Sequence, residues 1–229
     1  MKIGSLISGG KDSMFAAYLT KKEGNELVCL GTMHAENADS YMFHVPNIRL
    51  TKLQAESMVL PLVEGKTKGV KEDELSDLED LLREMKEQHE IEGITTGAIA
   101  SQYQKSRVDA ICEKLGLKSI APLWGRDQEG IVKEMIESKF EIIIISVAAE
   151  GLDERWLGRE LDDGALGDLM KLHMKYKISP VGEGGEYDTF VINCPLFDRK
   201  IEIGETEKHW DTKARWGWLE IKKARLVDV

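Results

Sequence analysis

Short apolar runs alternate with helix-like patterns from the N-terminus to about Trp124. The clearest helix is Glu72–Glu90, in which Leu75, Leu78 and Met85 recur at the helical spacing of three to four residues. Alternation of strands and helices is typical of a parallel sheet that helices cover on both faces. We expect strands at Lys2–Ile7, Glu26–Met33, Val59–Val63, Ile94–Ala98 and Lys118–Leu123, and further helices at Asp12–Lys22, Asn47–Met58 and Tyr103–Leu115.

The pattern changes after Trp124. Helices are predicted at Gln128–Lys139 and Gly164–Tyr176, with a β-branched strand at Phe140–Val147 between them. From Tyr187 onward, extended segments rich in Thr, Val, Ile and Trp predict antiparallel strands, with turns near Asp198-Arg199 and Gly204. We therefore expect an N-terminal domain over 1–124 and a smaller C-terminal α+β domain over 125–229. No Pro/Gly/Ser-rich linker separates them, so they should share an interface and a cleft.

The amino-acid composition excludes several functional classes for this chain. The 229 residues are 42% hydrophobic, and 31 basic against 41 acidic side chains give a net charge of −10, which disfavours direct binding of nucleic acid. The longest apolar stretch, Ile142–Ala149, is too short to cross a membrane, and no apolar signal region follows Met1, so we expect a cytoplasmic protein. Cys29, Cys112 and Cys194 lie far apart, which excludes a C-x-x-C zinc or redox site and favours buried thiols.

The most informative segment is Ser8–Ser13, with the sequence Ser-Gly-Gly-Lys-Asp-Ser, between the first strand and the first helix. Gly9 and Gly10 allow a tight turn whose amides approach an anion, and the following helix points its positive end at the same place. Lys11 adds a charge and the two serines add hydroxyl groups. Asp12 either caps the helix or helps to hold a metal ion that bridges phosphates. The spacing is not that of a Walker A loop, and the alternative is a structural Gly-Gly turn.

This segment, Ser8, Gly9, Gly10, Asp12 and Ser13 in particular, resembles the signature of the PP-loop ATP pyrophosphatases, which cleave ATP between its α and β phosphates. The resemblance implies a doubly wound parallel sheet (PP-loop, HUP-like) with the nucleotide beyond the carboxyl ends of its strands. Nucleotide contacts are then expected at the rim formed by His34, Gly97, Ala98 and Ile99, although ordinary loop roles are the alternative there.

A second segment, Gly182–Thr189, places Glu183 and Glu186 on either side of Gly184 and Gly185. A backbone this free of side chains, with acids on both sides, is suited to close approach of a cation, of ammonia or of another ligand, while a flexible hairpin entry is the alternative. A third cluster, Ser101–Arg107, begins a helix on which Tyr103 and Arg107 share a face. Arg107 is suited to pair with a carboxylate or phosphate, or else is an exposed helical arginine.

Together these segments resemble the diphthine–ammonia ligases, a subgroup of the PP-loop enzymes, over nearly the whole chain, and they indicate the minimal, archaeal type. One mild departure is Asp188, where the family often has Glu. The segments that carry the resemblance are Asp39–His44, Gly97–Ser101, Tyr103–Arg107, Pro122–Trp124 and Glu183–Tyr187.

The resemblance implies ATP-dependent amidation of diphthine, a modified histidine of elongation factor 2, through an acyl-adenylate, with release of AMP and pyrophosphate. ATP and Mg²⁺ would be required, ammonia would come from solution or a partner, and a homodimer stays open. Asp12 is the expected metal ligand. The implied catalytic residues are Lys11, Asp12, Arg107, Glu183 and Glu186, and the implied substrate contacts are Tyr103, Gln104, Trp124, Gly184, Gly185, Tyr187 and Thr189.

Diphthine carries a trimethylammonium group, which favours aromatic faces. We hypothesise that some of Trp124, Trp156, Tyr187 and Glu186 line its pocket, with core packing as an equal alternative for each Trp. Two other functions stay open at this point. One is a tRNA-modifying PP-loop enzyme, either an adenylating sulfurtransferase or a lysidine-type ligase, and the other is a non-catalytic module that binds ATP or AMP.

Overall fold

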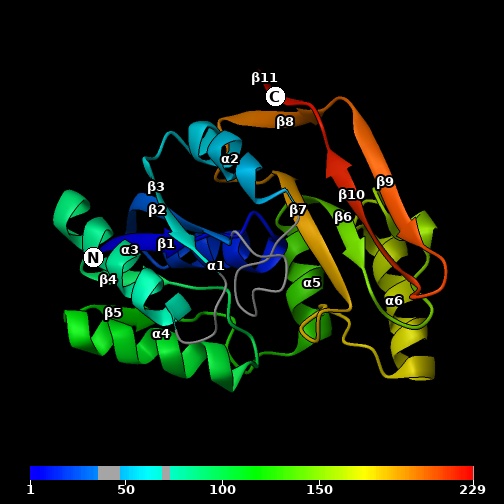
Figure 1. Ribbon diagram of the computed structural model, residues 1–229, viewed down its shortest axis with the longest axis horizontal. Coiled ribbons are helices and arrows are strands. Elements are labelled where there is room, and N and C mark those ends of the chain that lie inside the picture. The colour runs from blue at the N-terminus through cyan, green and yellow to red at the C-terminus, as the bar shows by residue number, and fades with distance from the viewer. Residues whose placement is uncertain (36–46, 69–72, 229) are drawn as a thin grey trace.

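The computed structural model describes residues 1–35, 47–68 and 73–228, so the Asp39–His44 segment lies outside the described residues. Its first half holds a five-stranded parallel sheet in the order β3-β2-β1-β4-β5 (Figure 1). This confirms the predicted α/β fold with a doubly wound sheet. The strands are β1 (Lys2–Leu6), β2 (Glu26–Ala35), β3 (Leu62–Thr67), β4 (Gly93–Thr95) and β5 (Lys118–Ile120).

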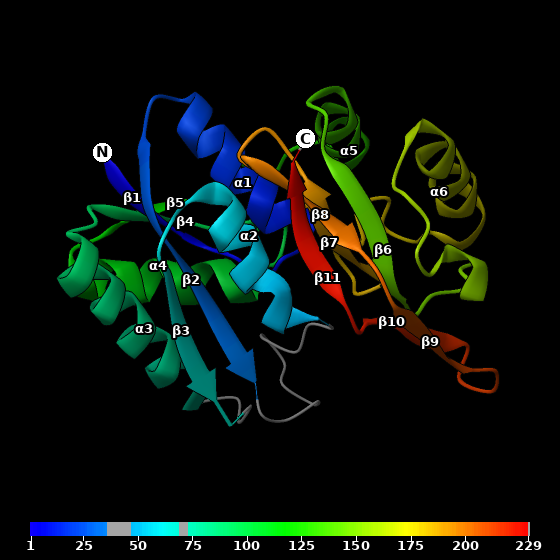
Figure 2. The same ribbon diagram turned by 90° about the horizontal axis from the view of Figure 1, so that it is seen from above.

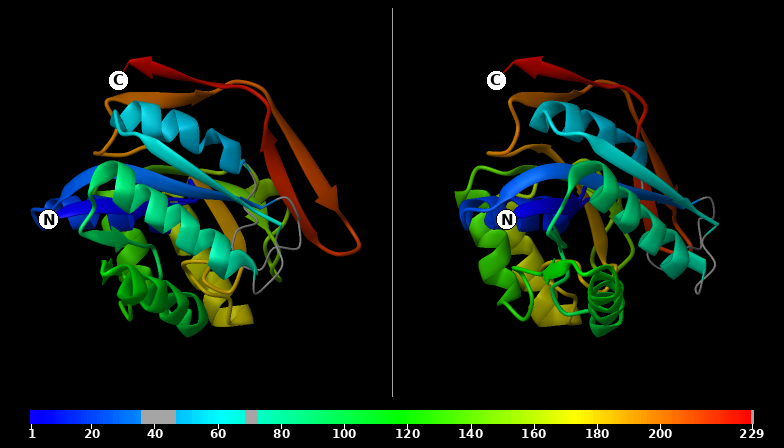
Figure 3. Two further views of the ribbon diagram at one scale, coloured as in Figure 1. Left: turned by 60° about the vertical axis from the view of Figure 1, so that its left-hand side comes forward. Right: turned by 90° about the vertical axis from the view of Figure 1, so that its left-hand side faces the viewer.

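Helices cover both faces of this sheet, as Figure 3 shows with α2 on one side and α4 on the other. Residues of α3 and α4 form a separate hydrophobic cluster on one face, with Met85 and Cys112 fully buried. The other face belongs to a larger cluster that contains α1 and part of α2. The helices are α1 (Lys11–Lys22), the 3-10 turn η1 (Ile48–Leu50), α2 (Thr51–Met58), α3 (Asp73–His89) and α4 (Gln102–Leu115).

The C-terminal half is antiparallel, as the extended pattern predicted. One sheet has the order β7-β6-β10-β9, and β8 pairs with β11 in a two-stranded sheet that lies over α2 (Figure 2). The elements are α5 (Gln128–Glu137), β6 (Glu141–Val147), the 3-10 turn η2 (Glu154–Trp156), α6 (Asp163–Tyr176), β7 (Tyr187–Asn193), β8 (Arg199–Ile203), β9 (Thr206–Asp211), β10 (Trp216–Ile221) and β11 (Ala224–Asp228).

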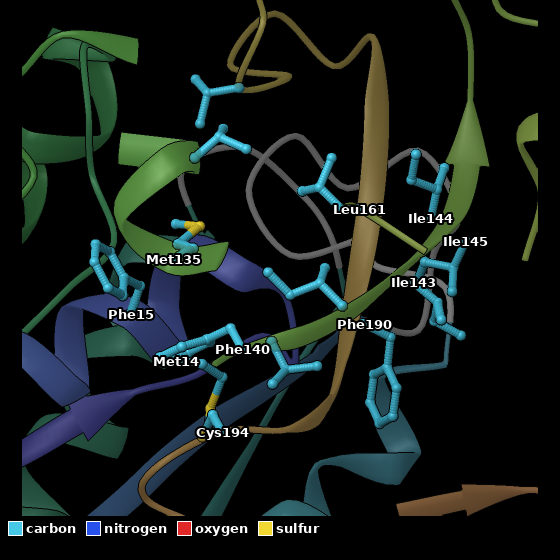
Figure 4. Packing of buried hydrophobic residues seen from close by; sticks show 14 of the residues in the cluster. Met14, Phe15, Met135, Phe140, Ile143, Ile144, Ile145, Leu161, Phe190 and Cys194 are labelled. Carbon is cyan, nitrogen blue, oxygen red and sulfur yellow. The ribbon is translucent and has the colours of Figure 1, made fainter. Parts of the chain in front are cut away.

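One continuous core joins the two halves. Met14 and Phe15 of α1 lie in the same cluster as Met135, Phe140 and Phe190 of the C-terminal half (Figure 4). The rings of Phe15 and Phe140 meet edge to face with centroids 5.4 Å apart, a favoured aromatic geometry. The expected shared interface is therefore present, and the domain boundary after Trp124 stays a prediction.

The predicted strand at Val59–Val63 is wrong in position. Val59 has φ of +54° and ends α2, and the Leu60 amide donates to the Ala55 carbonyl, as at a helix C-terminus. The apolar pair therefore finishes a helix, and β3 begins only at Leu62.

The three cysteines are free and buried, as predicted. Burial raises the pKa of Cys29 and of Cys194 to about 12 and that of Cys112 to about 11. In residues 1–35, 47–68 and 73–228, no helix has the length and apolarity that a membrane span requires.

Candidate active site

The segment Ser8–Ser13, called the phosphate loop below, follows β1 at the point where the strand order reverses. Strand β1 pairs with β2 on one side and with β4 on the other, so the loop opens at the topological switch point where parallel sheets bind ligands. Gly9 has φ of +84°, which only glycine adopts without strain. The expected strand, glycine turn and helix are therefore all present.

The N-terminus of α1 lacks a side-chain cap. Its N-cap is Gly10, whereas Asp127 and Asp162 cap α5 and α6 through their carboxylates. Asp12 lies in the first turn, so the alternative in which it caps the helix is wrong. The first amides of a helix have no intrahelical acceptor, and this N-terminus therefore has the character of an anion site.

The two serines of the phosphate loop hold it in shape. Ser13 Oγ accepts from the Ser8 amide at 3.2 Å and donates to the Gly10 carbonyl at 3.1 Å. Ser8 Oγ lies 3.4 Å from the Gly10 amide. These contacts are internal to the loop, so both hydroxyl groups already support its turn.

Strand β7 holds the loop from the other half of the chain. The Lys11 amide donates to Thr189 Oγ1 at 3.1 Å, and the Val191 amide donates to the Gly9 carbonyl at 3.0 Å. Gln54 of α2 also donates to the Gly9 carbonyl, at 3.0 Å. Thr189 is 4% exposed and supports the loop, and its predicted contact with substrate stays a prediction.

The Lys11 side chain is buried rather than open to solvent, with 2% of the residue exposed. Its ammonium donates to the Val181 carbonyl at 2.5 Å and to Asp12 Oδ2 at 3.0 Å, and it lies 5.1 Å from the Tyr187 ring centroid. The Lys11 ammonium therefore connects the phosphate loop to residues 181–187, which include the second Gly-Gly pair. Its direct contact with pyrophosphate stays a prediction.

Asp12 has the character of a metal ligand. Its Oδ1 is buried without a hydrogen-bond partner among the described residues, while Oδ2 is held by Lys11. Burial raises the pKa of this carboxyl despite the opposing charge of Lys11. A hard carboxylate oxygen with an unused lone pair, beside a phosphate loop, fits the Mg²⁺ that the resemblance implies.

Gly97 lies directly against the start of α1. A Cβ placed on Gly97 would lie 2.6 Å from Asp12 C and from Ser13 N, so the absence of a side chain is required. Ala98 follows at the rim. Ile99 is a core residue with 1% exposure whose carbonyl accepts from the Gly125 amide, and its contact with a nucleotide stays a prediction.

His34 lies at the carboxyl end of β2, as predicted. Its Nε2 is 2.9 Å from Glu64 Oε1 on the neighbouring strand, and Lys52 binds the same carboxylate. Although burial opposes it, hydrogen bonds from Lys52 and His34 lower the pKa of Glu64. His34 is thus hydrogen-bonded to a neighbouring carboxylate at the rim, and its contact with a nucleotide stays a prediction.

The segment Gly182–Tyr187, called the acidic loop below, is closed by its own carboxylates. Glu186 accepts from the Ser179 amide at 2.7 Å and from the Gly184 amide at 2.8 Å. Glu183 reaches outward, and its Oε1 accepts from the Ala100 and Ser101 amides at 2.9 and 2.8 Å. One acid therefore shapes the loop, while the other attaches it to the N-terminus of α4.

Helix α4 brings the third cluster to the same place. The Arg107 guanidinium lies 3.4 Å over the Tyr103 ring, which confirms the shared face, and Arg107 Nε is buried without a hydrogen-bond partner among the described residues. The Gln104 amide is capped by Ser101. Lys105 lies over the Trp124 ring at 5.5 Å, so one face of that ring already meets a cation of this chain.

Two aromatic residues of the hypothesised trimethylammonium pocket are buried in this structure. Tyr187 is 2% exposed, and its hydroxyl donates to the Pro180 carbonyl at 2.7 Å. Trp156 lies in a different hollow, under the Arg159 guanidinium at 4.4 Å and near Arg155 and Lys171. The trimethylammonium pocket therefore stays a prediction, and the core-packing alternative accounts for the burial of both rings.

Family models match both halves of the chain: the diphthamide synthase N-terminal domain over residues 1–119 and the diphthamide synthase C-terminal domain over residues 127–227. The chain belongs to the diphthamide synthase family. This confirms the resemblance that the glycine and acidic motifs indicated.

Curated relatives extend the comparison. Proteins named diphthine–ammonia ligase are 40% identical in Rattus norvegicus and 41% in Bos taurus, covering 90% of this chain and 84% of each relative. The relative of that name in Danio rerio is 40% identical over 100% of this chain and 97% of its own length, so chain length does not distinguish the archaeal type. These names confirm the predicted enzyme class, a carbon–nitrogen ligase.

A solved structure, described as a predicted subunit of tRNA methyltransferase from Methanocaldococcus jannaschii, has a TM-score of 0.44 and 16% identity. The alignment covers 85% of this chain and 98% of that chain. A likeness of this size supports no argument about function.

Two residues at the site lay outside the sequence prediction. Gln54 binds the phosphate loop from α2, and Ser179 accepts from the Glu183 amide and donates to Gln128. A glutamine within an ordinary helical pattern carries no signal by itself. Ser179, next to the Pro180-Val181-Gly182 turn, carries only a weak turn signal.

Proposed function

We propose that this chain catalyses the ATP-dependent amidation of diphthine on elongation factor 2, through an acyl-adenylate and with release of AMP and pyrophosphate. The observation that carries the proposal is the junction made by Lys11, which joins the phosphate loop to the acidic loop through the carbonyl of Val181, directly before that loop, and through the ring of Tyr187 within it. An adenylating ligase needs its nucleotide and its acceptor groups in one place, and this junction brings the two motifs together. The names of the relatives support the same chemistry.

On the nucleotide side, the α1 N-terminus and the phosphate loop would bind the phosphates of ATP. The uncapped Gly10 end and the amides of the first turn favour negative charge there. Asp12 Oδ1 would hold Mg²⁺, which when bound neutralises charge on the phosphates. Lys11 adds positive charge and holds Asp12 in place.

On the acceptor side, the diphthine carboxylate attacks the α-phosphate, pyrophosphate leaves, and ammonia then displaces AMP from the acyl-adenylate. Arg107 is the best candidate to orient a carboxylate, since its buried Nε has no hydrogen-bond partner in the described part of the chain. Trp124 and the exposed backbone of Gly184 and Gly185 are assigned to substrate contact. Ammonia would come from solution or from a partner.

The sulfur-transferring alternative loses support. Such enzymes commonly use paired reactive cysteines, and thiolates react only where the pKa is low. Here Cys29, Cys112 and Cys194 are buried, and burial raises the pKa of each thiol to about 11 or 12.

The test is to incubate the protein with ATP, Mg²⁺, ammonium and elongation factor 2 that carries diphthine. AMP and pyrophosphate should form in equal amounts, and only when the factor is present. The factor's histidine should lose one carboxylate and gain one amide, which mass spectrometry detects. ADP as the product, or turnover that requires tRNA, would contradict the proposal.

A further inference from the structure

Gln54 is a fully buried polar residue that neither glycine motif contains. It lies in α2 with 0% exposure, and its side chain reaches across to the phosphate loop and to β7 at once. Its Nε2 donates to the Gly9 carbonyl at 3.0 Å and to the Val191 carbonyl at 2.9 Å. Both partners are carbonyl oxygens, so the amide nitrogen and not the amide oxygen must face them.

The Gly9 carbonyl is therefore held from two directions, by Gln54 Nε2 and by the Val191 amide at 3.0 Å. A trans peptide unit is planar, and its C=O and N–H groups point to opposite sides. Fixing the carbonyl of Gly9 toward α2 and β7 thus turns the N–H of Gly10 the other way, where it donates to Ser8 Oγ at 3.4 Å. Without such a hold, the peptide would be free to rotate, because both flanking residues are glycines.

Stability alone does not account for Gln54. Its Oε1 is buried without a hydrogen-bond partner among the described residues, a cost that offsets the two bonds made by Nε2. An apolar side chain of the same shape would avoid that cost. What it would lose is the hold on the Gly9 carbonyl.

We infer that Gln54 is a positioning residue, which fixes the Gly9–Gly10 peptide and so holds the phosphate loop in the shape that receives a nucleotide phosphate. The inference rests on the proposed function for the identity of the anion, which is ATP. The orientation of the peptide itself does not depend on that function.

The test compares Gln54→Met, which keeps the length of the side chain but has no donor, with Ser57→Ala. Ser57 is the matched control because it lies three residues on in α2, is also fully buried, and its hydroxyl also bonds to C-terminal backbone, donating to the Arg199 carbonyl. It does not bond to the phosphate loop. The measurements are the Kd for Mg·ATP by calorimetry, the melting temperature, and the Gly10 amide resonance in NMR spectra without nucleotide.

We expect Gln54→Met to weaken ATP binding about tenfold, the effect of one typical hydrogen bond, and to shift the Gly10 resonance. Ser57→Ala should lower the melting temperature and change neither the Kd nor that resonance. Equal ATP affinity in Gln54→Met and the wild type, or an equal loss in Ser57→Ala, would overturn the inference.

If Gln54→Met does not fold, Gln54→Asn takes its place, since it keeps the amide but is one methylene too short to reach both carbonyls. It should give an intermediate Kd and a shifted Gly10 resonance, and an unshifted resonance would overturn the inference. Should the wild type bind no ATP, the proposed function fails, and the Gly10 resonance alone then decides the role of Gln54.

Discussion

The phosphate loop and the acidic loop both contain a Gly-Gly pair, yet they are held in opposite ways. The phosphate loop depends on groups from distant parts of the chain, among them Thr189 and Gln54. The acidic loop is closed mainly by its own Glu186, which binds amides two and seven residues away. The first loop is therefore assembled by the tertiary fold, and the second is largely preformed by local bonds.

The difference shows that glycines serve different ends in the two loops. Gly9 supplies the positive φ of the phosphate loop, and Gly97 leaves room where its own segment lies against the start of α1. Gly185 has φ of +79° with nothing near a Cβ, so it serves the turn alone. Substitutions at matched positions should therefore separate loss of ligand binding from loss of stability.

The largest effect is expected for Asp12→Asn. It leaves the shape of the side chain unchanged but removes the negative charge from the buried Oδ1, and AMP formation should fall about 100-fold or more. The measurement is the rate of AMP release at saturating Mg²⁺, with Asp127→Asn, a change at the remote cap of α5, as the control that stays active. Full activity in Asp12→Asn would contradict the role of Asp12 as a metal ligand.

Gly97→Ala should come next. Its Cβ would collide with the backbone of Asp12 and Ser13, costing about 1–3 kcal/mol of folding free energy and distorting the phosphate loop. ATP affinity should drop about tenfold or more, since 1.4 kcal/mol is tenfold.

The matched variant is Gly185→Ala, which should cost about 1–2 kcal/mol because of its positive φ. It should leave ATP affinity unchanged. Urea unfolding and calorimetry measure the two quantities, and equal losses of ATP affinity in both variants would contradict the comparison.

Glu186→Gln should loosen the acidic loop more than Glu183→Gln does. Both oxygens of Glu186 accept from backbone amides. In a glutamine the side-chain NH₂ would replace one of these oxygens and face a backbone N–H, which should lower the stability of the loop by about 1–3 kcal/mol. Glu183 uses one oxygen for two amides, and a glutamine oxygen can replace it with loss of only the charge effect at α4, about 0.3–1 kcal/mol. Hydrogen exchange over residues 179–187 measures the difference, and the reverse order would show that Glu183 is the main support.

The smallest effect is expected for Thr189→Val, which removes the acceptor of the Lys11 amide. The loss of about 1 kcal/mol should weaken ATP binding several-fold. Thr189→Ser keeps the hydroxyl group and should restore the affinity. If the serine variant binds as weakly as the valine variant, packing of the methyl group and not the hydrogen bond supports the loop.

The sequence by itself determined the features that depend on neighbouring residues. Alternation of apolar runs with helical periodicity predicted the parallel sheet, and the glycine turn before α1 predicted the loop at its switch point, because strand and helix patterns and turn chemistry are local. The spacing of Cys29, Cys112 and Cys194 was likewise enough to predict free, buried thiols.

Only the tertiary structure decided which side chains are buried and which groups they contact. The contact of Lys11 with pyrophosphate stays a prediction, and the structure adds what the sequence could not, that its ammonium donates to the Val181 carbonyl, 170 residues further along the chain. Tyr187 is buried in the core, the Trp156 ring lies under the Arg159 guanidinium, and Gln54 of α2 binds the phosphate loop. The burial of a side chain and its contact partners are set by segments that are remote in sequence. The sequence of one protein alone does not indicate which remote segments will be in contact.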